Sequence, residues 1–259
     1  MKLTFLGTGT SFGVPQIGCG CAVCHSPDPR DKRSRVGALV ESDRGVRLLI
    51  DTPPELRMQL INAGVDRVDA VLFTHDHADH THGIDDIRAI SNRRDVPLEM
   101  YGPADSLARL ARRFAYIFDE NIRALPGTSK PEGRAVALED GEHVAIGDLD
   151  VVAVAVPHGP VSVFGYRIGP LAYITDAKEI PTAAMTAFAG AKVLVINALF
   201  RTGHPTHLSI PEAIRVAQKI GAERTYLTHL THDNFHADLE AELPHGIMPA
   251  FDGLTVRID

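Results

Sequence analysis

The sequence predicts an α/β protein built as one large domain, and three observations lead to this expectation. Its 259 residues, 44% of them hydrophobic, suffice for a single two-layered or four-layered domain with a substantial core. Short apolar runs alternate with stretches of helical periodicity, and the strand pattern restarts in the second half of the chain, from Val151. Seventeen prolines and 22 glycines, spread along the chain, predict many turns between short elements.

The predicted strands are apolar runs bounded by turn residues. The first ends at a glycine-rich turn, residues 7–11, which lacks the Gly-Lys-Ser/Thr of a phosphate-binding loop. A hairpin turn at 43–45 joins two later strands. The expected strands span 2–6, 36–41, 46–50, 70–73, 98–101, 151–156, 163–168, 171–175, 193–197 and 225–228, with a terminal strand closing the chain through 251–254.

The predicted helices begin at recognisable caps. Thr52 and Glu55 have the form of a capping box for a helix that ends at Gly64, and Ser209 and Glu212 form a second one. Further helices are expected at 83–90 and 105–118. On the latter, Arg109, Arg112 and Arg113 are expected on the solvated side, with a phosphate-facing role as the alternative.

Composition excludes several classes of protein. The net charge of −7 gives no general attraction to nucleic acid or to an anionic membrane. No run of 18 apolar residues is present, so no transmembrane helix is expected, and the N-terminal apolar stretch is too short for a signal peptide. Three cysteines crowded between Cys19 and Cys24 argue against a disulfide scaffold. A cytoplasmic protein is expected.

A histidine-rich motif follows the apolar run 70–73. His75 and His77 are two residues apart, so an extended backbone directs both imidazoles the same way. Asp79 and His80 come where a turn can start a helix. Imidazole and carboxylate together suit divalent zinc, manganese or iron, and so dense a set of ligands would hold two ions. The motif therefore predicts a metal site.

A second motif is Cys19-x-Cys21-x-x-Cys24, flanked by glycines. Thiolates at this spacing can wrap one zinc ion, but they need a fourth ligand from elsewhere for a closed tetrahedral site. Three unpaired buried cysteines are the alternative. The strand-end carboxylate Asp51 has two alternatives as well, orienting a ligand histidine or lying solvated at the end of its strand.

The histidine motif after an apolar strand resembles the signature of the metallo-β-lactamase superfamily. The resemblance implies a four-layer αββα fold, a single domain over residues 1–259 and a dinuclear hydrolytic centre. It implies that His158 joins His75 and His77 on one ion and that Asp176 bridges to a second ion. The implied metal ligands are His75, His77, Asp79, His80, His158, Asp176 and His229.

Within that superfamily, the cysteine motif is similar to the knuckle of the phosphoribosyl 1,2-cyclic phosphodiesterase family and to that of a pyrroloquinoline-quinone biosynthesis protein. In the phosphodiesterases a histidine near the C-terminus completes the site, and His232 stands at the matching position. The resemblance therefore implies a structural zinc in the segment 18–25, bound by Cys19, Cys21, Cys24 and His232.

The implied reaction is hydrolysis of a small phosphodiester, such as a cyclic phosphate or a nucleotide diester, by hydroxide generated at two zinc or manganese ions. His207 is the expected proton donor, with His204 as its competitor, and Asp76 or Asp79 is expected to accept hydrogen bonds from the nucleophile.

The alternatives are a tRNA 3′-processing nuclease, a lactonase or thioesterase of the same superfamily, or a non-catalytic metal- or metabolite-binding protein. A small-molecule substrate, no membrane or nucleic-acid partner, and a homodimer by analogy are expected. The substrate and the role of the loop within 115–135 stay open.

Overall fold

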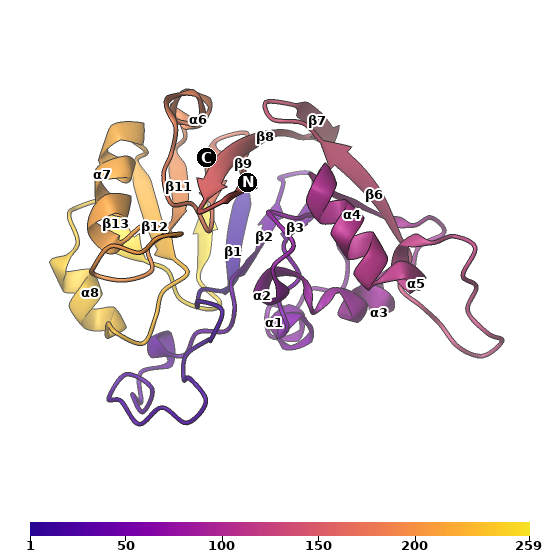
Figure 1. The fold of residues 1–259 in the computed structure, drawn as a ribbon, viewed down its shortest axis with the longest axis horizontal. Coiled ribbons are helices and arrows are strands. Elements are labelled where there is room, and N and C mark those ends of the chain that lie inside the picture. The colour runs from indigo at the N-terminus through magenta and orange to yellow at the C-terminus, as the bar shows by residue number, and fades with distance from the viewer.

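The computed structural model describes all 259 residues and shows two mixed seven-stranded sheets packed face to face (Figure 1). The strand order is β14-β1-β2-β3-β4-β5-β6 in the first sheet and β13-β12-β11-β10-β9-β8-β7 in the second. The strands are β1 Lys2–Gly7, β2 Gly37–Glu41, β3 Arg47–Ile50, β4 Ala70–Leu72, β5 Leu98–Pro103, β6 Gly133–Leu138, β7 His143–Ile146, β8 Leu149–His158, β9 Val161–Ile168, β10 Leu171–Ile174, β11 Val193–Asn197, β12 Arg224–Thr228, β13 Ile247–Pro249 and β14 Thr255–Arg257.

Both sheets follow the same pairing pattern. From β14 to β3 in the first sheet, and from β7 to β10 in the second, neighbouring strands are antiparallel. Beyond β3 and β10 all neighbours are parallel. The restart of the strand pattern that the sequence predicts is therefore a repeat of the sheet, in which β3 and β10 occupy equivalent places.

The helices form the two outer layers. Apolar side chains alternate along the strands: on β11, Val193 and Val195 pack between the sheets, whereas Leu194 and Ile196 pack against the outer helices. Helices of the first half of the chain cover the first sheet, and α6–α8 cover the second (Figure 1). This four-layer αββα arrangement confirms the expected fold. The helices are α1 Leu56–Asn62, α2 Ala78–Thr81, η2 Ile84–Ile87, α3 Arg88–Ser91, α4 Ala104–Arg113, α5 Ala115–Phe118, α6 Thr182–Phe188, α7 Ile210–Ile220 and α8 His236–Glu242, with a short η1 at Pro29–Asp31.

Two local expectations about helix starts differ in outcome. The capping box at Ser209 is present, because its hydroxyl accepts from the Glu212 amide and the Glu212 carboxylate accepts from the Ser209 amide. The prediction of a capping box at Thr52 is wrong. Its hydroxyl donates to the carbonyl of Thr81 (3.2 Å), and α1 begins only at Leu56.

Other differences lie where local signals are weak. The helix expected at 105–118 is interrupted at Phe114, whose extended φ of −122° separates α4 from α5. The last strand begins at Thr255, just after the expected range, and β6, β7, β13, α6 and α8 are elements that the sequence did not indicate. None of the helices combines the length and the apolar character that crossing a bilayer requires.

Candidate metal centre

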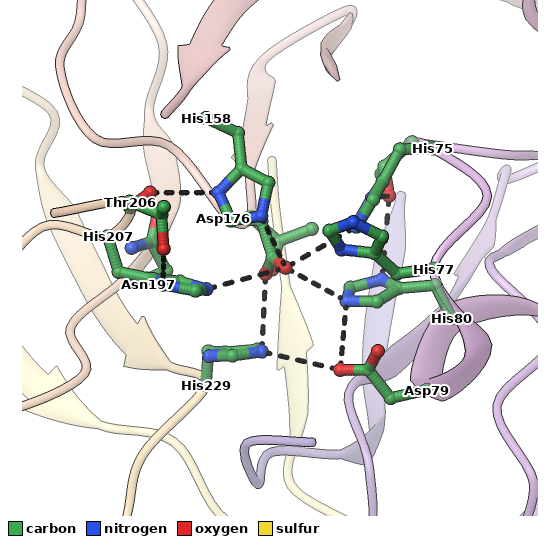
Figure 2. A network of polar contacts seen from close by, with 12 residues as sticks. His75, His77, Asp79, His80, His158, Asp176, Asn197, Thr206, His207 and His229 are labelled. Carbon is green, nitrogen blue, oxygen red and sulfur yellow. Dashed lines mark hydrogen bonds and ion pairs between the residues drawn. The ribbon is translucent and has the colours of Figure 1, made fainter. Parts of the chain in front are cut away.

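The ends of strands from both sheets meet at one place and carry the predicted ligands. His75 lies just beyond β4, His158 ends β8, and Asp176 lies just beyond β10. His229 directly follows β12. Because parallel neighbours present their carboxyl ends at the same edge of a sheet, these side chains converge although the chain separates them widely. Figure 2 shows them pointing toward a common centre around Asp176.

The converging donors form two groups that share Asp176. Within each group the candidate ligand atoms lie within 4.8 Å of one another. The Asp176 carboxylate lies 3.5 Å from His75 Nε2 on one side and 3.2 Å from His80 Nε2 on the other. The first group is His75, His77, His158 and Asp176, and the second is Asp79, His80, Asp176 and His229. All seven predicted ligands are thus brought together.

The buried ring nitrogens of this cluster fit metal ions. The Nε2 atoms of His75, His80 and His229 are buried and have no hydrogen-bond partner within the protein, an arrangement that is costly unless a ligand satisfies them. On the opposite ring edge, His80 Nδ1 lies 2.7 Å from Asp51 and His75 Nδ1 lies 3.0 Å from the Thr74 hydroxyl. Those contacts leave the Nε2 lone pairs directed at the centre, as divalent zinc or manganese requires.

Asp51 takes the first of its two alternatives. Its side chain is fully buried, and it accepts hydrogen bonds from the backbone amide and the hydroxyl of Thr74, both at 2.8 Å. With these contacts in place, the carboxylate orients His80. His158 is held similarly, because its Nδ1 lies 2.8 Å from the carbonyl oxygen of Thr206.

Three of these residues have a left-handed backbone, which is uncommon outside glycine. The φ angles of Asp51, Asp176 and His229 are 62°, 61° and 57°. Asp51 and Asp176 follow β3 and β10, the equivalent strands of the two sheets. Such conformations persist where surrounding contacts enforce them, and they concentrate at functional sites. The residue after Asp176 is held by Asn197, whose side-chain amide pairs with both backbone groups of Ala177 (2.8 and 3.1 Å).

Asn197 was not anticipated as part of the site. The signal available was the one that marks the other members, namely a polar residue ending an otherwise apolar strand.

Charges within the cluster favour an ionised aspartate. Burial by itself raises the pKa of Asp176, but the neighbouring His229 and His80 outweigh it and hold the pKa well below its ordinary value. Burial lowers the pKa of His75 far below that of a free imidazole, which keeps its ring neutral. Burial by itself lowers the pKa of His80, but Asp176 and Asp79 outweigh it and hold the pKa well above its ordinary value, so binding of a cation would release a proton from this ring.

His207, rather than His204, reaches the cluster. His207 Nε2 lies 3.5 Å from the Asp176 carboxylate, and its ring stacks on that of His229 with centroids 4.9 Å apart. Its Nδ1 lies 2.9 Å from the hydroxyl of Thr206 (Figure 2). The His204 ring contacts His207 rather than the cluster, and the Nδ1 atoms of the two histidines lie 3.3 Å apart. Burial lowers the pKa of His207 although Asp176 opposes this.

Asp76 is placed away from the other predicted residues. Its carboxylate accepts two hydrogen bonds from Arg109 on α4, at 2.7 and 2.9 Å, and Arg113 donates to its carbonyl oxygen at 3.0 Å. The carboxylate forms no ion pair with a histidine of the cluster. All three arginines are exposed, as expected, and Arg109 and Arg113 also anchor the histidine-rich loop through Asp76.

The cysteine motif and His232 also come together. All three thiols are free, and their sulfur atoms lie 3.2, 3.5 and 3.4 Å from His232 Nδ1 for Cys19, Cys21 and Cys24. The Cys24 amide donates to the Cys21 sulfur and lowers the pKa of that thiol to about 6, which favours thiolate. Three sulfurs and one imidazole around a common point fit a tetrahedral zinc ion.

Backbone pairing explains how the cysteines reach His232. The loop after β1 runs beside the segment after β12, because the Leu230 amide donates to the Thr8 carbonyl (2.9 Å) and the Thr10 amide donates to the Leu230 carbonyl (3.2 Å). The same segment carries His229. The two candidate metal sites therefore share one short stretch of chain, residues 229–232.

The four-layer fold and the two groups of histidine and aspartate define a metal-dependent hydrolase. Residues 46–230 match the family described as the beta-lactamase superfamily domain, and the chain belongs to that family.

Similar proteins carry several names. The crystal structure described as a new diphosphatase from the PhnP family superposes with a TM-score of 0.91 at 37% identity, covering 100% of this chain and 98% of that one. An octanoyltransferase of Porphyromonas gingivalis is 39% identical over the whole of this chain, which spans 52% of that protein. A ribonuclease Z of Myxococcus xanthus is 28% identical, covering 100% of this chain and 98% of that protein.

Proposed function

We propose that this protein is a phosphodiesterase that hydrolyses small cyclic phosphates or nucleotide diesters with two divalent ions, zinc or manganese. The ions would bind at the shared cluster, which is the set of seven predicted ligands joined by Asp176. Two groups of donors joined by Asp176 would present two cations to the two non-bridging oxygens of a phosphodiester. The similarity to a diphosphatase over the whole chain supports phosphoryl chemistry. The observation that carries the proposal is the position of His207 beside the shared carboxylate.

When bound, the two ions would supply hydroxide at neutral pH and polarise the phosphoryl oxygens. The protein provides the other functions. Asp79 is the more open of the two shared-cluster carboxylates, with 14% of its side chain exposed against 2% for Asp176, so it can accept a hydrogen bond from the attacking water. Asp176 is enclosed and holds the two groups together.

His207 supplies the proton that the departing alkoxide needs. Its Nε2 is buried without a hydrogen-bond partner, while Thr206 fixes the opposite ring edge. The anionic phosphate of a bound substrate would stabilise the imidazolium and offset the lowered pKa of this ring. A histidine so placed acts as general acid on the leaving group.

The cysteine cluster serves a structural role in this proposal. A zinc ion bound by Cys19, Cys21, Cys24 and His232 has no open position for substrate. It would hold the N-terminal loop against the segment that carries His229. A Cys21→Ser variant should therefore lose activity through lower metal occupancy of the shared cluster. Full activity together with full occupancy would contradict this role.

The test is hydrolysis of bis(p-nitrophenyl) phosphate with added manganese or zinc. Asp79→Ala should abolish turnover, and His207→Ala should lower kcat by about 10²- to 10⁴-fold with unchanged metal content. Asp66→Ala and His245→Ala, both at exposed positions outside the cluster, are matched controls that should retain full activity. Turnover that survives Asp79→Ala would overturn the proposal.

A tRNA-processing nuclease is the second candidate, because the similarity to ribonuclease Z extends over nearly the full length of both chains. The net charge of −7 weighs against a polyanionic substrate. Cleavage of a precursor tRNA without hydrolysis of small diesters would select the nuclease. Hydrolysis of an octanoyl thioester alone would instead select acyl chemistry, in line with the name of the octanoyltransferase.

A further inference from the structure

A pocket of about 180 Å³ opens beside His207, between the shared metal cluster and the cysteine cluster. One wall comes from the loop after β1 and includes Phe12, and the other comes from the segment after β11 and includes Phe200 and His204. His207 and His232 also line it, so it touches both candidate metal sites. None of the groups assigned to hydrolysis except His207 lies in this pocket.

The walls of the pocket are aromatic. The Phe12 side chain is 66% exposed, although a phenyl ring of this size is usually covered by the chain. Phe200 and His204 lie with ring centroids 5.7 Å apart, and His204 and His207 with centroids 5.2 Å apart. Exposed aromatic faces on two sides of a narrow pocket provide stacking surfaces for a flat ring.

The rim of the pocket offers unused polar groups. Ser11 and Gln16 both line it, and both form hydrogen bonds within the chain only through backbone atoms. Their hydroxyl and amide groups are free to pair with the edge of a ligand. A purely apolar occupant such as an acyl chain would make no use of these groups, whereas a heteroaromatic ring could pair with them.

The volume limits what the pocket holds. A volume of about 180 Å³ lies below the roughly 300–1,000 Å³ typical of pockets for drug-sized ligands. This space suits one flat ring system and is too small for a complete nucleotide. The remainder of a nucleotide would extend past His207 toward the shared cluster, where the phosphate is expected.

We propose that this pocket binds the nucleobase of the substrate between Phe12 and Phe200, so that the enzyme prefers nucleotide phosphodiesters to sugar phosphates that lack a base. The inference rests on the proposed phosphodiesterase function, because it places the phosphate at the shared cluster. His207 both lines the pocket and, in the proposed reaction, donates the proton to the leaving group. The nucleobase would therefore belong to the part of the substrate that departs as the alcohol.

The test compares two ligands that differ only in the base. Adenosine 5′-monophosphate and ribose 5-phosphate are titrated calorimetrically into the manganese-loaded protein. The nucleotide should bind about tenfold more tightly, in keeping with the strength of one stacked base. In Phe12→Ala and Phe200→Ala this preference should fall to about twofold. Ile61→Ala, which removes another exposed apolar side chain, on α1 and outside the pocket, is the matched control and should keep the preference.

The two proposals can fail separately. Equal binding of the two ligands to the wild-type protein, or weak binding of both, would overturn the nucleobase pocket even if bis(p-nitrophenyl) phosphate is hydrolysed. A preference for the nucleotide that depends on Phe12, in a protein without diesterase activity, would retain the pocket and overturn the proposed reaction. Circular dichroism and zinc content show whether each variant is folded.

Discussion

Replacing Asp51 by asparagine tests whether this buried carboxylate sets the proton position on His80. The amide can still accept the hydrogen bond from the Thr74 backbone, but an NH₂ group replaces the oxygen that lies 2.7 Å from His80 Nδ1. Two donors would then face each other. His80 can restore the hydrogen bond only by moving its proton to Nε2, the atom that faces the shared cluster.

The expected loss follows from this contact. Removing a partner that orients a ligand histidine typically weakens metal binding by about 10- to 100-fold, which corresponds to about 1.4–2.8 kcal/mol. The weakening should affect the group that contains His80 and leave the cysteine cluster unchanged, because Asp51 contacts none of its members.

The assay is competitive titration of metal-free protein with zinc against a chromophoric chelator. Asp66→Asn, at a side chain that is 73% exposed, is the matched control for removing one carboxylate charge. If every dissociation constant of Asp51→Asn stays within about threefold of the wild-type values, Asp51 does not control the tautomer of His80 and the reasoning fails.

Three further outcomes are expected. Arg109→Ala should lower the free energy of unfolding by only about 0.5–1 kcal/mol, because half of its side chain is exposed at the pair with Asp76; a loss above about 3 kcal/mol in urea denaturation would contradict this. Ser209→Ala should cost about 1 kcal/mol in the same assay through loss of the cap, and an unchanged midpoint would count against it. Burial and the nearby Arg33 lower the pKa of His236 to about 4, so the stability it contributes is full above about pH 6.5 and is lost as the pH falls toward 4. In metal-free protein, going from pH 7.5 to 5 should therefore cost the wild type about 1–2 kcal/mol more than His236→Asn, and equal losses would refute the assignment.

Local sequence patterns predicted much of the fold and part of the site. The apolar runs were long enough to predict most strands. The dense motif from His75 to His80 predicted a metal site from its residue types and spacing. His158, Asp176 and His229 were different, because a single polar residue at a strand end has no distinctive pattern. Their assignment came from the family resemblance, and the structure shows why they belong together: their strands end at the same edge.

Contacts between distant segments account for what the sequence could not show. Asp76 looked like a member of the cluster because of its neighbours, but the packing of α4 brings Arg109, 33 positions away, onto its carboxylate. Thr52 had the spacing of a helix cap, yet its hydroxyl donates to the Thr81 carbonyl and α1 begins only at Leu56. The role of Asp51 depended on its burial and on the ring of His80, neither of which can be read from a strand end.

The left-handed backbone at Asp51, Asp176 and His229 has a consequence for the evolution of this protein. Glycine adopts that conformation freely, whereas other residues pay on the order of 1 kcal/mol or more at each position. At position 51, exchange to glycine would relieve this strain but would leave the Thr74 amide and hydroxyl and the His80 ring without their buried partner, which costs more than the strain. Laboratory evolution toward thermostability without an activity screen should therefore retain aspartate at position 51, and its replacement by glycine in such an experiment would contradict this reasoning.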